Sequence, residues 1–261
     1  MDFIHSHQNP LFKQLHKLAT LRRERLKSRQ TLLDGPHLLA SALDAGWSIE
    51  RLVVTEAGFA NPEIVALRAR TPAPLNVLSD ELYTALSELP SPSGVLAMVS
   101  IPEPKSVRQD GLCLLLDGVQ DPGNVGAILR TAAAAGVQQV LLSPGCADIW
   151  SPKVLRAGMG AQFVLDLVER ADLLAFADRF EGRIAATLLD GAVDLYAADL
   201  SGPLALVVGA EGSGVSDELA ARAGLRLRIP MVTGIESLNV GAAAAICLYE
   251  RVRQAGLGAA V

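Results

Sequence analysis

Hydrophobic residues in the second half of the chain fall into short apolar runs separated by stretches with helical spacing. Short apolar runs bounded by turn residues are typical of buried strands, and a three-to-four-residue repeat indicates a helix. The strands expected from this pattern are Leu112–Asp117, Gln139–Leu142, 163–168, 183–188, Leu204–Gly209 and 225–229. The expected helices are 124–135, 153–159, 173–180 and a segment from Ser237 onward. This alternation predicts an α/β fold with a parallel sheet.

The first half of the chain shows a similar alternation with fewer and shorter elements. Strands are expected at 51–55, 75–79 and 94–100, with helices at 36–45, 61–70 and 80–89. This pattern predicts a small α/β domain over residues 31–100. Residues 101–110 carry Pro102 and Pro104 and have no apolar pattern, so we expect a semi-rigid linker there. The second domain is then expected at 111–261.

A basic segment precedes the small domain, within residues 1–30. Residues 10–29 are expected to form one amphipathic helix whose apolar ridge consists of Leu11, Leu15, Leu18 and Leu21. The segment has a single acid, Glu24, although the chain as a whole has a net charge of −5. A solvated helix face is the simple interpretation, but such concentrated charge favours an arm that contacts phosphates. Its basic residues are Lys13, Lys17, Arg22, Arg23, Arg25, Lys27 and Arg29.

Composition limits the remaining classes of protein. Half of the residues are apolar but only 4% are aromatic, which is typical of the aliphatic core of an α/β protein. The net negative charge gives no overall attraction to nucleic acid, so any nucleic-acid binding has to depend on a local patch. Three widely spaced cysteines match neither a metal site nor a disulfide framework. Without a signal sequence or membrane span, we expect a cytoplasmic protein with no metal and no membrane contact.

The last predicted strand and helix enclose a polar loop with the sequence TGIESLN. Ser237 is expected to be the N-cap of the helix, with Asn239 in its first turn. A second candidate site follows the strand Leu204–Gly209, where glycines occupy positions 209, 212 and 214. Their order does not match the dinucleotide-binding or phosphate-loop motifs, which excludes a nicotinamide-dependent oxidoreductase. Close approach of the backbone to a ligand and a simple turn both remain open for this segment.

Three segments together resemble the motifs of SpoU/TrmH-type RNA 2'-O-ribose methyltransferases of the SPOUT superfamily. They are DPGNVGAILRTAAAAGV, LVVGAEGSGVSDEL and LRIPMVTGIESLNVGAAAAICLYE, and they occur in the family's order. The resemblance extends over roughly residues 112–255. Residues 31–102 resemble, more weakly, the RNA substrate-binding domain that precedes the catalytic domain in many members, mainly through Asp34-Gly35.

The resemblance implies a SPOUT-type parallel sheet with a deep trefoil knot, a homodimer and a methyl donor, S-adenosylmethionine. The donor would be held by the backbone of 206–212, 228–231 and 236–238. The implied cofactor-binding residues are Leu206, Val208, Gly209, Glu211, Gly212, Ile229, Met231, Ser237 and Leu238. The implied activity is methylation of a ribose 2'-hydroxyl, with ribosomal RNA as the expected substrate. Transfer RNA, or a non-catalytic RNA-binding or assembly protein on the same fold, is the alternative.

The family's catalytic residues correspond to Asn124, Arg130, Glu211, Ser237 and Asn239. Arg130, which would also contact RNA, is the residue expected nearest the chemistry. Its role as a base, a phosphate clamp or a stabiliser of the developing alkoxide is left open, although a guanidinium is effectively always protonated. Glu211 is expected to orient Asn124 or Arg130, with a structural ion pair as the alternative.

Other polar side chains carry no predicted chemistry. We expect the four histidines, His5, His7, His16 and His37, to lie on the surface. Lys153 and Arg156 could contact RNA or form a solvated helix face.

Overall fold

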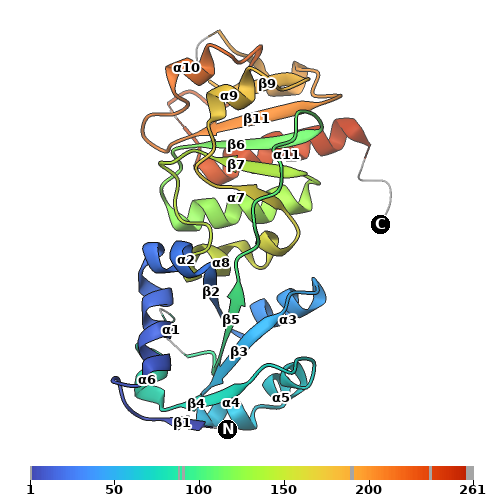
Figure 1. Ribbon diagram of the computed structural model, residues 1–261. Coiled ribbons are helices and arrows are strands. Elements are labelled where there is room, and N and C mark those ends of the chain that lie inside the picture. The colour runs from blue at the N-terminus through green and yellow to red at the C-terminus, as the bar shows by residue number, and fades with distance from the viewer. Residues whose placement is uncertain (1, 88, 90–91, 189–190, 235–236, 257–261) are drawn as a thin grey trace. The chain divides into compact units, whose positions relative to one another are not determined.

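The chain folds into two compact units, each of which is built from two separate pieces of sequence. The computed structural model describes residues 2–87, 89, 92–188, 191–234 and 237–256. Unit 1 combines Met1–Glu103 with Asp148–Phe163, and unit 2 combines Pro104–Ala147 with Val164–Val261. The chain therefore passes between the units three times (Figure 1). Each unit has its own sheet.

The sheet of unit 1 has five strands in the order β1-β4-β3-β5-β2. Strands β2 and β3 pair antiparallel with β5, whereas β1 and β3 pair parallel with β4. The strand bounds are β1 Asp2–Ile4, β2 Gln30–Asp34, β3 Ile49–Val54, β4 Leu75–Leu78 and β5 Val95–Ser100. The sequence pattern predicted β3, β4 and β5 to within two residues but did not indicate β1 or β2.

Helices cover both faces of this sheet (Figure 1). Phe12, Leu15 and Leu18 pack with Leu82 and Tyr83 on one face. The helix bounds are α1 Pro10–Thr20, α2 Arg22–Ser28, α3 Pro36–Asp44, α4 Glu56–Ala60, α5 Pro62–Arg68 and α6 Asp80–Thr84. The helix expected at 80–89 therefore ends at Thr84, and position 88 lies outside the described residues.

The single helix expected over residues 10–29 is wrong. Leu21 adopts an extended conformation (φ −117°, ψ 109°) and separates α1 from α2. The buried ridge of α1 consists of Phe12, Leu15 and Leu18. The sequence pattern could not place the break, because Leu21 is itself a good helix former.

A segment between two strands of unit 2 completes unit 1. It contains α8 (Pro152–Gly158) and a 3₁₀ turn, η1 (Ala161–Phe163). Asp148, at its start, accepts hydrogen bonds from Nε and Nη2 of Arg25 at 2.9 and 2.6 Å. The Thr31 hydroxyl donates to the carbonyl of Trp150 at 2.6 Å. Trp47 also packs against Trp150.

The Asp34-Gly35 pair is part of the same arrangement. Asp34 is buried at the end of β2 and accepts hydrogen bonds from the hydroxyls of Ser87 and Ser93 at 2.6 and 2.9 Å. Nη1 of Arg156, on α8, lies 3.6 Å from its carboxylate. Arg156 is thereby engaged with the interior of unit 1, which argues against the expected RNA contact and solvated helix face.

Unit 2 has a seven-stranded sheet in the order β10-β12-β9-β11-β6-β7-β8. Every pairing is parallel, as predicted. The strand bounds are β6 Leu112–Asp117, β7 Gln139–Leu142, β8 Asp166–Val168, β9 Arg183–Thr187, β10 Val193–Asp194, β11 Leu204–Gly209 and β12 Leu225–Arg228. The central strands β6, β7 and β11 match their expected bounds because apolar runs buried on both faces give an unambiguous signal.

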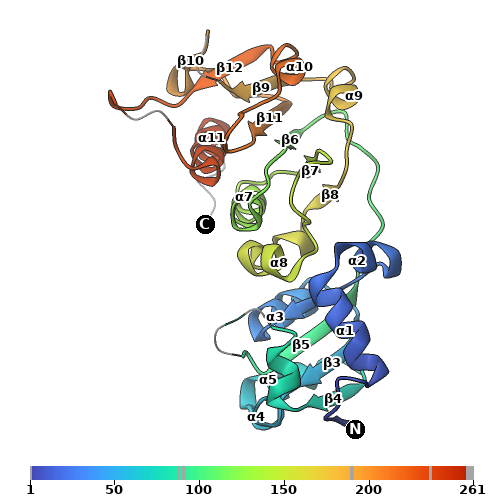
Figure 2. The same ribbon diagram turned by 90° about the vertical axis from the view of Figure 1, so that its left-hand side faces the viewer.

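Two layers of helices enclose this sheet (Figure 2). Helices α7 and α11 lie on one face, and α9 and α10 lie on the other. The bounds are α7 Pro122–Ala134, α9 Leu173–Ala177, α10 Asp217–Ala220 and α11 Val240–Ala255, with a 3₁₀ turn η2 at Leu195–Ala197. No helix in the described residues is long and apolar enough to cross a membrane.

The predicted N-cap of the last helix is wrong. Helix α11 begins at Val240, and its N-cap is Asn239, whose Oδ1 accepts from the amides of Gly241 and Ala242 at 2.9 and 3.2 Å. Ser237 lies two residues before this cap. Both residue types are good N-caps, so local preference alone cannot choose between them.

We predict that Arg25→Ala lowers the free energy of unfolding of unit 1 by about 3 kcal/mol, because the substitution leaves Asp148 buried without its cation. The side chains of Arg25 and Asp148 are only 5% and 10% exposed. Urea unfolding followed by tryptophan fluorescence measures this effect selectively, since both tryptophans of the chain, Trp47 and Trp150, belong to unit 1.

The matched control is Arg23→Ala. The Arg23 side chain is 81% exposed, with Glu24 at 3.7 Å, and its loss should change stability by less than about 1 kcal/mol. Equal effects of the two substitutions would contradict a structural role for the pair formed by Arg25 and Asp148.

Candidate active site

Loops from separate parts of unit 2 converge at the carboxyl edge of its sheet. Because β9, β11 and β12 are parallel neighbours, the segments that follow them leave at the same edge. The residues before α11 return to this edge. Together they surround a cavity of about 720 Å³. Its lining includes residues 187–188 at the end of β9, 208–215 at and after the end of β11, 228–229 and Met231 at and after the end of β12, and 237–238 before α11.

The cavity brings together most of the residues expected to bind the cofactor. Those that line it are Val208, Gly209, Glu211, Gly212, Ile229, Met231, Ser237 and Leu238. Leu206 is not among the lining residues, because it lies in the middle of β11 with 2% of its surface exposed. Glu236, in the expected 236–238 segment, lies outside the described residues.

The glycine-rich segment after β11 forms a tight reversal of the chain. The amide of Ala210 donates to the carbonyl of Gly214 at 3.0 Å, and the amide of Gly214 donates back at 2.9 Å. A Cβ on Gly209 would lie 2.0 Å from the carbonyl carbon of Gly214, so the reversal requires glycine there. Gly212 at the tip has open space where a side chain would be. The segment is therefore both a turn and a cavity wall, with backbone accessible to a ligand.

Three predicted catalytic residues form one chain of hydrogen bonds. Nδ2 of Asn124 donates to Oε1 of Glu211 at 2.9 Å, and Nδ2 of Asn239 donates to Oδ1 of Asn124 at 3.0 Å. Asn239 in turn caps α11 through its own Oδ1. We call these three side chains the amide relay. It joins the start of α7, the start of α11 and the loop after β11.

The two ends of the amide relay determine which way each amide points. An ionised carboxylate only accepts hydrogen bonds, so the NH₂ group of Asn124 faces Glu211. The backbone amides of α11 only donate, so the carbonyl of Asn239 faces them. A single arrangement satisfies every group, and it holds Glu211 in place as an anion. The expected orientation of Asn124 by Glu211 agrees with this geometry.

The surroundings of Glu211 favour its charged form. Partial burial by itself raises the pKa of a carboxyl. The hydrogen bond from Asn124 and those from the backbone amides of Glu211, Gln120 and Asp121 outweigh it and hold the pKa of Glu211 below its usual value. Glu211 is therefore better suited to orienting polar groups than to taking up a proton at neutral pH.

Arg130 lies apart from the amide relay. It is exposed on α7 and does not line the cavity. Within the part of the chain that the structure describes, its guanidinium has no hydrogen-bond or ion-pair partner. Asn124 is six residues earlier on α7, which places the two side chains in different directions around the helix. The chain by itself therefore does not place Arg130 in the lining of its own cavity.

The residues of the expected RNA arm divide into exposed and engaged groups. Lys13, Lys17, Arg23 and Lys27 are exposed, whereas Arg22 and Arg29 are half-buried. Arg29 interacts with Glu103 and with the carbonyl of Pro102. Arg25 is buried against Asp148, so its expected phosphate contact is corrected to a structural ion pair. On α8, Lys153 is exposed, and all four histidines lie on the surface, as expected.

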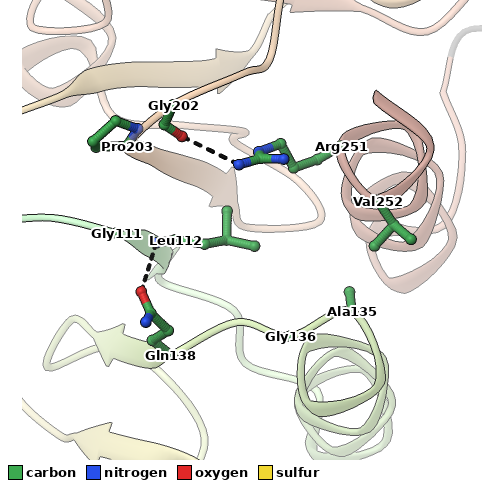
Figure 3. Close-up of a pocket in the computed structure, with 9 residues that line it drawn as sticks. All are labelled: Gly111, Leu112, Ala135, Gly136, Gln138, Gly202, Pro203, Arg251 and Val252. Carbon is green, nitrogen blue, oxygen red and sulfur yellow. Dashed lines mark hydrogen bonds between the residues drawn. The ribbon is translucent and has the colours of Figure 1, made fainter. Parts of the chain in front are cut away.

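A second cavity, of about 300 Å³, lies where β6 and β11 begin (Figure 3). Its walls include Leu112, Pro203 and Val252, with Arg251 donating to the carbonyl of Gly202 at 3.3 Å. None of the predicted site residues lines it. The larger cavity at the opposite, carboxyl edge is therefore the candidate active site.

Comparison with known proteins identifies the family. The SpoU rRNA Methylase family matches residues 111–249, and the MRM3-like substrate binding domain matches residues 9–97. The protein belongs to the SpoU rRNA methylase family. The family predicted from the three motifs is thus confirmed, and this SpoU member is a methyltransferase that uses S-adenosylmethionine.

Similar proteins share both units of this SpoU protein. The 23S rRNA (guanosine(2553)-2'-O)-methyltransferase RlmP of Bacillus subtilis is 33% identical over 95% of this chain and 98% of its own. A solved RNA 2'-O ribose methyltransferase is 33% identical with a TM-score of 0.83, over 97% of this chain and 99% of the other. The SpoU methyltransferase AviRb from Streptomyces viridochromogenes, solved with AdoMet, has 27% identity and a TM-score of 0.86, over 95% and 98% of the two chains.

The cavity has lining residues that the sequence motifs did not indicate. Thr187 is the last residue of β9, Leu188 follows it, and Arg226 belongs to β12. A positional signal was available, because each lies at or near the carboxyl end of a predicted parallel strand or in the segment that follows one. The missing information was the strand order, which places β9, β11 and β12 side by side.

We predict that Asn124→Ala raises the pKa of Glu211 toward its usual value, because the charged form loses a side-chain donor. In the wild type the lowered pKa stabilises the fold above the unfolded-state pKa, and this contribution is lost as the pH falls through the folded-state value. NMR titration of the carboxyl carbon, assigned with Glu211→Gln, measures the change. Thr131→Ala is the control, since that hydroxyl on α7 bonds only the carbonyl of Ala127. An unchanged pKa in Asn124→Ala would show that the amide relay does not hold Glu211.

Proposed function

We propose that this SpoU protein transfers a methyl group from S-adenosylmethionine to a ribose 2'-hydroxyl of ribosomal RNA in the cytoplasm. The observation that carries this proposal is the convergence of the β11 and β12 loops and the start of α11 on one cavity. The printed activity of RlmP, a 23S rRNA 2'-O-methyltransferase, supports the substrate class. The alternative of a non-catalytic RNA-binding protein is less well supported, because Asn124, Glu211 and Asn239 form a satisfied hydrogen-bond chain beside the cavity.

The cavity fits the proposed methyl donor in size and in chemistry. Its volume of about 720 Å³ lies within the range of pockets that hold drug-sized ligands. Val208, Ile229, Met231 and Leu238 supply apolar surface for a nucleobase. The backbone around Gly209 and Gly212 supplies polar groups that a side chain would otherwise cover. We propose that these residues, with Glu211 and Ser237, hold the donor.

The residues of the protein align the acceptor and stabilise charge. When bound, S-adenosylmethionine supplies an electrophilic methyl group. The amide relay fixes the edge of the cavity through Glu211, and Ser237 presents a hydroxyl at its wall. The guanidinium of Arg130 remains protonated, so we propose that it binds a substrate phosphate or stabilises the developing alkoxide rather than acting as a base.

We further propose that a second copy of the chain completes the site. Arg130 is exposed on α7 and outside the cavity lining, so a second chain that meets this helix could bring Arg130 to its own cavity. Helix α11 has an exposed face that includes Ala242 and Tyr249, the latter 51% exposed. Packing of α11 against its mate would explain this apolar surface. The trefoil knot in the C-terminal domain belongs to the same proposal.

The proposed domain roles follow the family matches. Residues 31–100 would form the RNA substrate-binding domain, residues 101–110 the linker and residues 111–261 the methyltransferase domain. The exposed cations of residues 1–30 would contact RNA phosphates. Residues 148–163 would act with the substrate-binding domain, since they pack in unit 1.

The test is incubation of the purified protein with radiolabelled S-adenosylmethionine and total RNA, followed by mapping of alkali-resistant linkages. One labelled ribose in ribosomal RNA is the expected result. Label confined to transfer RNA would favour the alternative substrate, and binding of RNA without transfer would favour the assembly role.

We predict that Arg130→Ala lowers the rate of methyl transfer by at least about a hundredfold. The dissociation constant for S-adenosylmethionine should stay within about twofold of the wild-type value. The residue lies outside the cavity lining, so donor binding should not depend on it. Calorimetry measures the binding, and Arg130→Lys tests whether charge alone is sufficient. Loss of donor binding in Arg130→Ala would contradict this assignment.

We predict that replacing Lys17, Arg23 and Lys27 together by glutamine weakens RNA binding. The slope of the logarithm of the RNA-binding constant against the logarithm of the salt concentration should become shallower by about 2. These three cations are exposed and belong to the segment with the highest density of positive charge. Filter binding over a range of salt concentrations measures the slope. Glu24→Gln in the same segment is the opposite control and should strengthen binding. An unchanged slope in the triple variant would leave these residues a solvated helix face.

A further inference from the structure

Two arginines on β12 line the cavity, and within the described residues neither is paired with an acidic side chain. Arg226 and Arg228 are exposed, and they are the only basic residues among the described residues that line the cavity. Neither forms a hydrogen bond or ion pair within the described part of the chain. Three other arginines of unit 2 are already paired with acids: Arg183 with Asp199, Arg222 with Asp178 and Arg253 with Glu250.

The register of the strands places both arginines on one face of the sheet. Arg226 is opposite Ala186 of β9, which packs in the core with Leu219 of α10. Residues two apart on a strand point the same way, so Arg228 follows Arg226. Leu227 between them is buried on the other side. The arginine pair therefore lies on the α10 face of the cavity, whereas the amide relay belongs to α7 and α11 on the opposite face.

In the part of the chain that the structure describes, the acidic residues around the cavity form no ion pair with these two arginines. Glu211 is engaged in the amide relay. Asp194 is opposite Arg228 in the register of β10 and β12, but its carboxylate accepts from the amide of Tyr196 at 2.9 Å. Asp217 lines the cavity at the start of α10 without an ion pair in the described chain. Two guanidinium groups therefore remain available for an anion at the rim.

We propose that Arg226 and Arg228 bind the phosphates of the RNA strand next to the nucleotide that is methylated. This inference rests on the proposed function and names the protein groups that hold the substrate backbone at the cavity. A ribose in an RNA strand has a phosphate on each side. Arg226 and Arg228 are the cations that line the cavity to which this ribose would bind. Arginine presents a planar set of donors that matches phosphate oxygens.

The spacing of the pair favours a polymer over a single small anion. Residues two apart on a strand are about 6.6 Å apart along it. Successive phosphates of an RNA strand present separate charges, so each can take one arginine. A lone carboxylate, such as that of the methyl donor, would occupy one guanidinium and leave the other unpaired. Both side chains are exposed rather than enclosed in the cavity, which fits a ligand that extends beyond it.

The test compares Arg226→Ala/Arg228→Ala with Arg183→Ala/Arg222→Ala. Both double variants remove two arginines from unit 2, but the control removes cations that are already paired with acids. In the test variant we expect the RNA dissociation constant to rise by roughly tenfold and the log–log salt slope to fall by about 1.4. The control should leave both near the wild-type values, and Arg226→Lys/Arg228→Lys should restore most of the salt slope.

Donor binding separates the two sources of anionic charge. Calorimetric titration with S-adenosylmethionine alone should give wild-type affinity in the test variant. A loss of donor affinity with unchanged RNA affinity would overturn the inference and assign the pair to the donor's carboxylate. Equal RNA affinity and salt slope in the test and control variants would also overturn it.

The wild-type protein, assayed in parallel for methyl transfer, distinguishes the two levels of the proposal. Absence of transfer by the wild type would count against the proposed function. Transfer by the wild type, with RNA binding unaffected in the test variant, would count against the arginine pair alone.

Discussion

The site depends on one geometric constraint, the common direction of the strands of unit 2. Because β9, β11 and β12 run parallel and adjacent, the loops that follow them meet at one edge although they are far apart in sequence. The amide relay then fixes the distance between these loops and the helices. Asn124 has both its donor and its acceptor satisfied, by Glu211 and Asn239, so a shift of the loop or of either helix would break at least one of these two hydrogen bonds. The sheet brings the parts together, and the amide relay holds them in register.

Two ion pairs hold the separate pieces of unit 1 together. Arg25 and Asp148 are 123 positions apart, yet they form a buried pair. Arg156 and Asp34 form a second link between the same two pieces of chain. A segment that lies between β7 and β8 of unit 2 is therefore required to satisfy charges inside unit 1. Because of this shared segment, substitutions in residues 148–163 should be interpreted first as changes to unit 1, even though they fall within the matched methylase region.

The sequence predicted those features that depend on local pattern. Strands β6, β7 and β11 are apolar runs buried on both faces, and their bounds were predicted without error. The loops expected to hold the cofactor were predicted from motifs, and all of the expected residues except Leu206 line the cavity. The errors concern non-local choices. The burial of Arg25 is decided by Asp148, and the cap of α11 is decided by which of two good capping residues the amide relay engages. Strand β2 was missed because it ends in Asp34, and aspartate is rare in strands. The partners of Asp34, Ser93 and Arg156, lie on later segments of the chain.

Pairing within the fold determines which cations remain for an anionic substrate. The chain is acidic overall, so a positive residue contributes to RNA binding only where the fold leaves it uncompensated. Arg25 and Arg156 form ion pairs with buried acids, and Arg183 and Arg222 form ion pairs with surface acids. Counting basic residues along the sequence therefore overestimates the RNA-binding surface of the first segment. It also overlooks β12, where Arg226 and Arg228 alternate with the buried Leu227 and have no acidic partner among the described residues. Charge density along the chain suggests where to look, but the distribution of partners in the folded protein decides which side chains are free to bind.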